Sequence, residues 1–270
     1  MRTSIKLVLL YFLMQFLAAI AAAPIGIAYT YITSGKLDPV AAQDVILPLA
    51  MLLGFLFMGI YLWKKGYLKN DGLLYSWKPA SVTLWALLAG VCCIVLIDFI
   101  MSFVKLPDLM ENTFDILQSG WAGILSIALL GPILEEYLFR GAITKELLKR
   151  YTPTKAILFS GLIFGVFHLN PPQIVAACFS GFLFAWLYWR TRSLIPGILI
   201  HILNNSLSTY LSVSYPELKD ATTTDLIGLP AQLALTAVAL LLFLLAIKKI
   251  KAGTRPVATC PSDDTTSVQP

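Results

Sequence analysis

Long runs of hydrophobic residues, separated by short polar stretches, follow one another along almost the whole chain. Most runs approach or exceed the roughly 20 apolar residues that a helix needs to cross the hydrocarbon core of a membrane. The pattern therefore predicts an all-α, polytopic membrane bundle of about eight transmembrane helices. The predicted spans lie at roughly 5–31, 45–63, 82–104, 121–143, 156–169, 174–189, 194–213 and 229–250.

Composition agrees with this pattern and excludes a soluble globular protein. Of the 270 residues, 58% are hydrophobic and 13% are charged, and the mean hydropathy is +0.78. Because the spans recur without a break in composition, we expect one transmembrane domain over residues 1–250, followed by a polar tail at 251–270 that we expect to be disordered. The first run, which has Arg2 and Lys6 at its start and small residues near Ala23, also fits a cleaved signal peptide. A retained first span is the simpler interpretation.

Basic residues alternate with the predicted spans. If the N-terminus is cytoplasmic, 17 of the 20 lysines and arginines fall on the cytoplasmic side, and only Lys36, Lys105 and Lys219 fall outside. The positive-inside rule thus predicts an integral, multi-pass protein with both termini in the cytoplasm. The net charge of +5 does not indicate nucleic-acid binding, because the basic residues lie in connections between spans.

Two adjacent carboxylates, Glu135 and Glu136, interrupt the fourth apolar run, and Arg140 follows them. Charged side chains inside a membrane are costly and usually carry function. On a helix, Glu136 and Arg140 are four residues apart and share a face, so they can pair. Glu135 is rotated by about 100° from Glu136 and can point elsewhere. One carboxylate can therefore be structural while the other remains free for chemistry.

The chain has two histidines, and both lie in apolar runs. His168 lies one helical turn after Phe164, and His201 lies one turn before Asn205. A lone histidine in a helix bundle is most often a packing residue with one hydrogen bond. Together with the two glutamates, however, they fall on three spans with little other polarity, at similar estimated depths in the inner half of the membrane. We therefore expect Glu135, His168, His201 and Asn205 to meet.

Such a cluster can hydrolyse a bond in two ways. Glu135 can act as a general base on water that His168 orients, while His201 and Asn205 stabilise an oxyanion; this scheme requires no cofactor. Alternatively, Glu135, His168 and His201 form a set that can bind a divalent metal such as zinc and leave one position for water. The residues alone do not decide between the two schemes.

The order Glu135-Glu136-x-x-x-Arg140, Phe164-x-x-x-His168 and His201-x-x-x-Asn205 resembles the three motifs of the CPBP (Abi) family, whose eukaryotic members are the type II CaaX prenyl endopeptidases. The match covers a motif core of about 120–213. The resemblance implies an eight-helix intramembrane protease with a cytosol-facing cavity. It also implies that Glu135 and His168 activate water and that His201 and Asn205 hold the oxyanion, with Glu136, Arg140 and Phe164 supporting them.

A peptide or membrane protein is then the expected substrate, and the lipid bilayer of a bacterial inner membrane is the expected surrounding. Two other readings use the same residues. Buried Glu, His and Arg side chains also form the relays of proton-coupled transporters. A non-catalytic membrane scaffold or immunity factor is the other alternative. Asp98, alone in the third run, is as compatible with helix packing as with function and is not assigned to the site.

Overall fold

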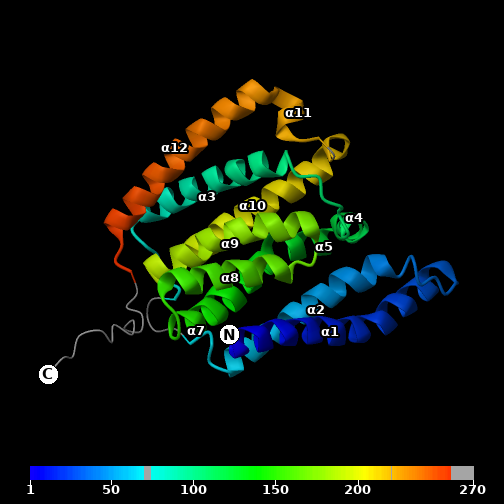
Figure 1. Ribbon diagram of the computed structural model, residues 1–270. Coiled ribbons are helices and arrows are strands. Elements are labelled where there is room, and N and C mark those ends of the chain that lie inside the picture. Colours follow the sequence, from blue (N-terminus) through cyan, green and yellow to red (C-terminus); the bar gives the residue numbers. More distant parts are fainter. Residues whose placement is uncertain (70–73, 220, 257–270) are drawn as a thin grey trace.

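The computed structural model describes residues 1–69, 74–219 and 221–256, and these residues form helices and connections with no strand among them (Figure 1). Every predicted apolar run is helical. The elements are α1 (Arg2–Ser34), α2 (Gln43–Lys64), α3 (Ala80–Met101), α4 (Glu111–Gln118), α5 (Trp121–Leu125), η1 (Ser126–Leu130), α6 (Gly131–Glu136), η2 (Tyr137–Thr144), α7 (Lys145–Leu148), α8 (Pro153–Phe167), α9 (Pro171–Thr191), α10 (Ile195–Ser214), η3 (Pro216–Leu218), α11 (Thr223–Ile227) and α12 (Leu229–Gly253).

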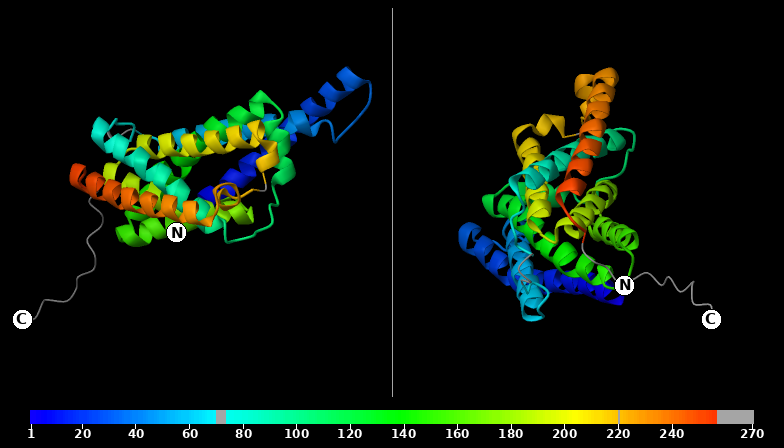
Figure 2. Two further views of the ribbon diagram at one scale, coloured as in Figure 1. Left: turned by 90° about the horizontal axis from the view of Figure 1, so that it is seen from above. Right: turned by 90° about the vertical axis from the view of Figure 1, so that its left-hand side faces the viewer.

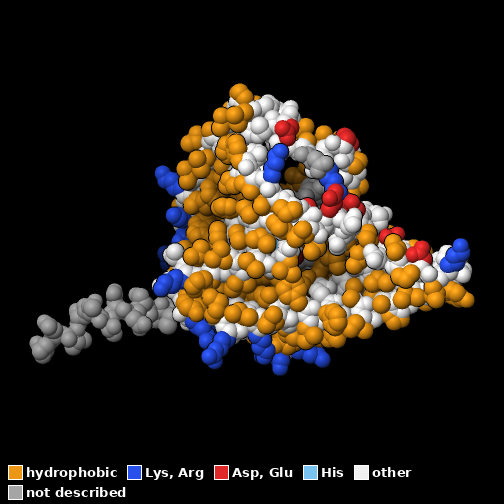
Figure 3. Space-filling model, turned by 45° about the vertical axis from the view of Figure 1, so that its right-hand side comes forward, with side chains coloured by type: hydrophobic (Ala, Val, Ile, Leu, Met, Phe, Trp, Pro, Cys, Tyr) orange, Lys and Arg blue, Asp and Glu red, His pale blue; other side chains and the backbone are white. Residues whose placement is uncertain are grey.

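Six helical stretches of the described chain are long and apolar enough to cross a membrane. They are α1, α2, α3, α9, α12 and the continuous helix Trp121–Leu148, which runs from α5 to α7. The other two predicted spans are α8, an apolar helix of 15 residues, and α10, a helix of 20 residues. The prediction of a polytopic helical membrane bundle is therefore confirmed. Apolar side chains also cover much of its outer surface, as a lipid-facing protein requires (Figure 3).

The bundle is built from helices that pair with their neighbours in the chain or in space. α1 pairs with α2, α8 with α9, and α3 with α12, while the Trp121–Leu148 helix and α10 contact each other in the middle. The far tips of α1 and α2 project beyond the other helices (Figure 2). Asn170, Pro171 and Pro172 divide α8 from α9 as predicted, because proline cannot continue a helix but fits its first turn.

Small residues bring α8 and α9 into close contact. A Cβ atom on Gly165 would lie 2.6 Å from the carbonyl oxygen of Ile174, and one on Gly181 would lie 2.9 Å from the Cα of Gly161. Membrane helices use such glycines because packing between backbones, rather than exclusion from water, drives their association. This contact fixes the end of α8, where Phe164 and His168 lie.

The Trp121–Leu148 helix contains two π-helical turns, η1 and η2, on either side of the paired glutamates. Pro132 has no backbone N–H, and the N–H of Gly131 bonds to the carbonyl of Ser126. The carbonyl oxygens of Ile127 and Ala128 consequently accept from side chains of α10. Asn205 Nδ2 donates to Ile127 O at 3.0 Å, and the hydroxyl of Ser206 donates to Ala128 O at 3.4 Å. These two hydrogen bonds, to carbonyls left free near Pro132, join the Trp121–Leu148 helix to α10.

The two ends of the bundle differ in charge. The N-terminus, α7 and the end of α12 lie toward the left of Figure 1, and α4, α11 and the connection between α1 and α2 lie at the right. The basic residues that end α2, α9 and α12 all lie at the first end. α12 continues to Gly253, three residues beyond the predicted boundary. Residues 257–270, which contain most of the predicted tail, lie outside the described residues.

The charge distribution gives a testable orientation. A reporter fused to the C-terminus should be active in the cytoplasm, and one inserted near Asp108 should be active outside, because basic residues favour the cytoplasmic side. Paired reporters, one active only in the cytoplasm and the other only after export, measure this in intact cells. An exported C-terminal reporter would overturn the orientation.

Candidate active site

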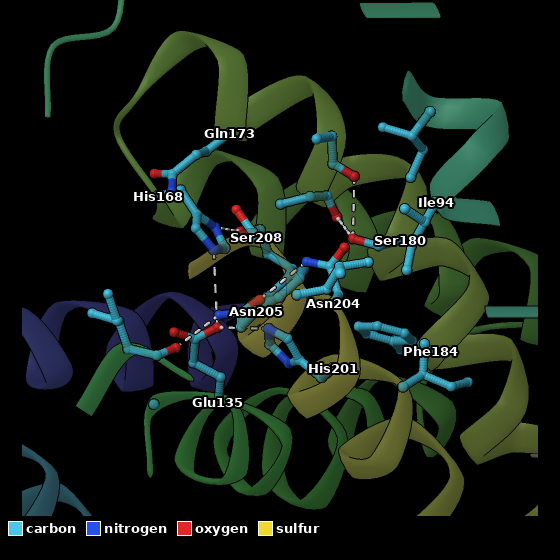
Figure 4. A pocket seen from close by; sticks show the side chains of 18 of the residues that line it. Ile94, Glu135, His168, Gln173, Ser180, Phe184, His201, Asn204, Asn205 and Ser208 are labelled. Carbon is cyan, nitrogen blue, oxygen red and sulfur yellow. Dashed lines mark hydrogen bonds and ion pairs between the residues drawn. The ribbon is translucent and has the colours of Figure 1, made fainter. Parts of the chain in front are cut away.

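The three sequence motifs meet in one cavity of about 530 Å³. Glu135 from α6, Phe164 and His168 from the end of α8, and His201 and Asn205 from α10 all line it. Figure 4 shows the side chains of Glu135, His168 and His201 turned toward one another. Residues from three separate spans therefore line one cavity, while their catalytic roles stay predictions.

Glu135 lies between the two histidines. Its Oε2 atom is 3.7 Å from His201 Nε2 and 3.9 Å from His168 Nε2. These distances are too long for hydrogen bonds but short enough for one small group to contact all three atoms. The same oxygen is buried and has no hydrogen-bond partner among the described residues, and the Glu135 side chain is 15% exposed. A carboxylate oxygen is therefore held at the cavity wall with its hydrogen-bonding capacity unused.

Glu136 and Arg140 lie behind the cavity and are fully buried. Arg140 Nη1 donates to Glu136 Oε1 at 2.8 Å, and Nη2 donates to the carbonyl of Gly181 on α9 at 3.3 Å. The Arg140 guanidinium also lies over the ring of Phe164, at 4.3 Å from its centroid. The two adjacent glutamates thus point in different directions, as the helical spacing predicted: Glu136 pairs with Arg140, whereas Glu135 lines the cavity.

Each histidine is oriented by a hydrogen bond at Nδ1. His168 Nδ1 is 2.8 Å from the carbonyl oxygen of Phe164, and His201 Nδ1 is 3.1 Å from Glu136 Oε1. A carbonyl and an ionised carboxylate only accept hydrogen bonds, so both Nδ1 atoms carry the proton and donate it. In both rings, Nε2 is consequently the atom that faces Glu135 and the cavity.

The backbone that follows His168 is fixed in an uncommon conformation. Leu169 has a φ of 55°, in the left-handed region, and so turns the chain from α8 toward α9. Asn170 is fully buried; it donates to Asp108 Oδ1 and accepts from the backbone N–H of Leu109, each at 3.0 Å. These bonds attach the connection after α3 to the turn that carries His168. Sequence reasoning did not identify this role of Asn170.

Other polar residues of the cavity were also missed. Asn204 donates to Asn205 Oδ1 at 3.1 Å and so orients that amide. Together with His201 and Ser208, these residues occupy positions i, i+3, i+4 and i+7 of α10, a polar stripe that the sequence does contain. The remaining polar lining residues that the sequence did not assign to the site include Gln173, Ser180 and Asp98.

The cavity lies toward the end of the bundle remote from the N-terminus. Its lining residues on α3 run from Gly90 to Met101, which is the second half of that helix, and those on α10 run from Ile200 to Leu211. Phe114 of α4 lines the same end. With the predicted orientation, the cavity would extend toward the outer side, whereas the resemblance implied a cavity that faces the cytosol; the side on which it opens stays a prediction. The position of His168 agrees with this placement, because α8 begins at the basic end of the bundle and His168 follows its last residue at the other end.

Binding of a metal ion by these residues would require small shifts of their side chains. No group of three His, Cys, Asp or Glu side chains in the described part of the chain is arranged to hold a metal ion. The nearest set is Glu135, His168 and His201, with glutamate-to-histidine separations of 3.7 and 3.9 Å. Tetrahedral zinc with bonds of about 2.0–2.2 Å would draw its ligand atoms to about 3.3–3.6 Å from one another.

Comparison with known proteins matches the same region. Residues 117–207 match the model of the family described as type II CAAX prenyl endopeptidase Rce1-like, a segment that contains all three motifs. The chain is 34% identical over 99 residues to YdiL of Bacillus subtilis, which is provisionally named a membrane peptidase, and these residues are 36% of this chain and 41% of that protein. The resemblance predicted from the motifs is confirmed.

Two further relatives match the chain over different extents. The membrane-embedded CAAX protease MroQ of Staphylococcus aureus is 34% identical over 107 residues, which are 37% of this chain and 43% of that protein. YajF of Lactococcus lactis is 28% identical over 173 residues, which are 62% of this chain and 77% of that protein. For YdiL and MroQ, the chain spans less than half of the relative's length. No solved structure matches the chain significantly.

Proposed function

We propose, on the basis of the resemblance of residues 117–207 to the Rce1-like endopeptidase family, that this protein is an intramembrane endopeptidase. It hydrolyses a peptide bond of a membrane-associated peptide or protein within the lipid bilayer. Glu135 activates water together with His168, and His201 with Asn205 stabilises the oxyanion. Glu136, Arg140 and Phe164 hold these groups in place.

The observation that carries the proposal is the different fate of two neighbouring carboxylates. Glu136 Oε1 is bonded by Arg140 at 2.8 Å behind the cavity, whereas Glu135 forms no ion pair with a lysine or arginine among the described residues and lines the cavity. Oε2 of each glutamate is buried without a hydrogen-bond partner there, but only that of Glu135 lies between the two histidines. A carboxylate oxygen buried without a hydrogen bond is costly to keep unless it has a task. Its oxygen lies within 3.9 Å of two imidazole nitrogens, which is the spacing that one small molecule can bridge.

The protonation pattern favours water as that molecule. Because His168 Nδ1 donates to the carbonyl of Phe164, Nε2 of the neutral ring accepts hydrogen bonds. Glu135, when ionised, also only accepts. Two acceptors that face one point bind a molecule with two O–H donors. A water bonded in this way loses one proton to Glu135 as its oxygen attacks the peptide carbonyl carbon, and the other proton keeps the attacking lone pair oriented.

The developing oxyanion needs donors, and α10 supplies two. His201 Nδ1–H is held by Glu136, so a second proton on Nε2 makes the ring a cation that donates into the cavity. In that state, the charges of Arg140 and His201 balance those of Glu135 and Glu136. Asn205 uses one N–H on the carbonyl of Ile127, which leaves its second N–H as the other donor. Glu135 then returns its proton to the leaving amine.

The direct test is cleavage of internally quenched peptides by the purified protein in proteoliposomes, with fragments identified by mass spectrometry. The scheme predicts that dialysis against EDTA or 1,10-phenanthroline leaves the cleavage rate within about twofold, because no step is routed through a metal. Loss of activity on chelation, with recovery on adding zinc, would replace this scheme with metal-assisted hydrolysis. Ion flux across the same vesicles without cleavage would point to a transporter instead.

A further inference from the structure

One face of α3 forms a wall of the cavity. The lining residues recur every three or four positions along this helix, which places them on a single stripe. The stripe consists of Gly90, Cys93, Ile94, Ile97, Asp98 and Met101. All of these residues except Asp98 are small or apolar. A single carboxylate is thus placed on an otherwise apolar wall, in the part of the cavity toward its outer end.

Among the described residues, Asp98 has no cationic partner. The only described side chain that bonds to it is Gln232 of α12, whose Nε2 donates to Asp98 Oδ2 at 3.0 Å. None of the Lys, Arg and His residues in the described chain forms an ion pair with it. Gln232 is fully buried, and its own Oε1 has no hydrogen-bond partner among the described residues. The Gln232 amide is therefore oriented so that its N–H bonds to Asp98, while its oxygen makes no hydrogen bond with the described residues.

An intramembrane carboxylate of this kind is expected to pair with a cation. Because the described chain supplies none and the carboxylate lines the cavity, we propose that Asp98 binds a basic residue of the peptide substrate and so determines specificity. This inference rests on the proposed endopeptidase function. The aliphatic stem of a lysine or arginine would pack along Ile94 and Ile97, and its charged group would reach Asp98. Ile94 is seen on the cavity wall in Figure 4.

The position of the basic residue follows from helix geometry. A Cβ on Gly90 would lie 2.4 Å from a side-chain carbon of Ile200. Gly90 of α3 therefore lies beside Ile200 of α10, the residue before His201. Asp98 is eight residues further along α3, which is about 12 Å toward the outer end. An extended chain spans about 3.3–3.6 Å per residue. The basic residue should therefore lie about three or four positions from the bond that is cleaved.

The outer end of the bundle is suited to admit such a peptide. Figure 3 brings this end forward and shows a hollow whose rim carries both basic and acidic side chains. Lys219 bridges Glu111 and Asp115 at 3.0 and 2.8 Å, so a lysine on this side is already neutralised by the acidic residues of α4. A cationic peptide residue then meets no unpaired positive charge from Lys219 on its way to Asp98.

The experiment has a cleavage arm and a binding arm. Wild-type protein in proteoliposomes is given a quenched-peptide library in which Lys, norleucine and Glu are placed in turn at each position. Lys should be favoured over norleucine by tenfold or more in kcat/KM at three or four residues from the cleaved bond. Asp98→Asn, which preserves shape and can still accept from Gln232, should reduce this preference to about twofold. Asp44→Asn, an exposed acidic residue at the start of α2, should retain it.

Binding separates this inference from the proposed function. Labelled Lys and norleucine peptides are titrated against Glu135→Gln protein with and without Asp98→Asn. A tenfold preference for Lys that disappears with Asp98→Asn supports the cation site, even if no peptide is ever cleaved. Equal binding of the two peptides to protein with Asp98 intact overturns it. An unchanged preference in Asp98→Asn overturns it as well. If Asp98→Asn does not fold, the wild-type preference decides alone.

Discussion

Replacing Glu135 with Gln is expected to reduce kcat/KM for peptide cleavage by about 10²–10⁴-fold, the usual contribution of a general base. Glutamine has nearly the same shape but cannot take a proton from water. The fold should be unaffected, because Glu135 Oε2 makes no hydrogen bond with the described residues that the substitution would break. Initial rates of peptide cleavage and thermal unfolding in the same detergent measure the two effects.

A matched control is Glu146→Gln. Glu146 lies on α7, away from the cavity, where its partner is the exposed Lys149. Because exposed ion pairs contribute little, this variant should keep both activity and stability. Full activity of Glu135→Gln would remove Glu135 from the role of base. Unfolding of Glu135→Gln would make it a structural residue and leave the proposed chemistry without a base.

Replacing Arg140 with Ala is expected to lower the free energy of unfolding by about 3–5 kcal/mol, the usual effect of removing one partner from a buried ion pair. Glu136 has no exposed surface, so the two glutamates would share only the His201 ring as a partner in an apolar interior. The substitution also removes the hydrogen bond to Gly181 and the contact with Phe164. Expression yield and urea unfolding in detergent micelles measure the loss.

Two comparisons isolate the cause. Arg150→Ala removes an exposed arginine ten residues further along the chain. It should change the free energy of unfolding by less than about 0.5 kcal/mol. Arg140→Lys keeps the charge but loses the planar fork, so its stability should lie between those of the wild type and Arg140→Ala. If Arg140→Ala unfolds like the wild type and lacks activity, Arg140 takes part in the chemistry rather than in the structure.

The sequence was sufficient to predict the helical membrane bundle and the motif residues that line the cavity, but not the other polar residues around them. Helices satisfy their own backbone hydrogen bonds, so a long apolar run identifies a membrane helix without knowledge of its neighbours. Helical spacing likewise placed Glu136 and Arg140 on one face and left Glu135 on another. The catalytic roles of these residues stay predictions, as does the cytoplasmic location of both termini.

The tertiary structure decided what depends on contacts between separate helices. The hydrogen bond of His201 to Glu136 joins residues 65 positions apart, and it determines which ring nitrogen faces Glu135. Pro132 released two carbonyls that α10 then bonded, so Asn205 has a structural contact that its motif does not reveal.

Asp98 shows the same division between sequence and structure. The sequence identified it as a charge within an apolar run, but could not distinguish helix packing from function. Both interpretations require the same residue type at the same depth in the membrane. Only the packing of α3 against α10 and α12 showed that Asp98 bonds to Gln232 on one side and lines the cavity on the other. Chain spacing determines which side chains share a helical face, whereas the assembled bundle determines what that face meets.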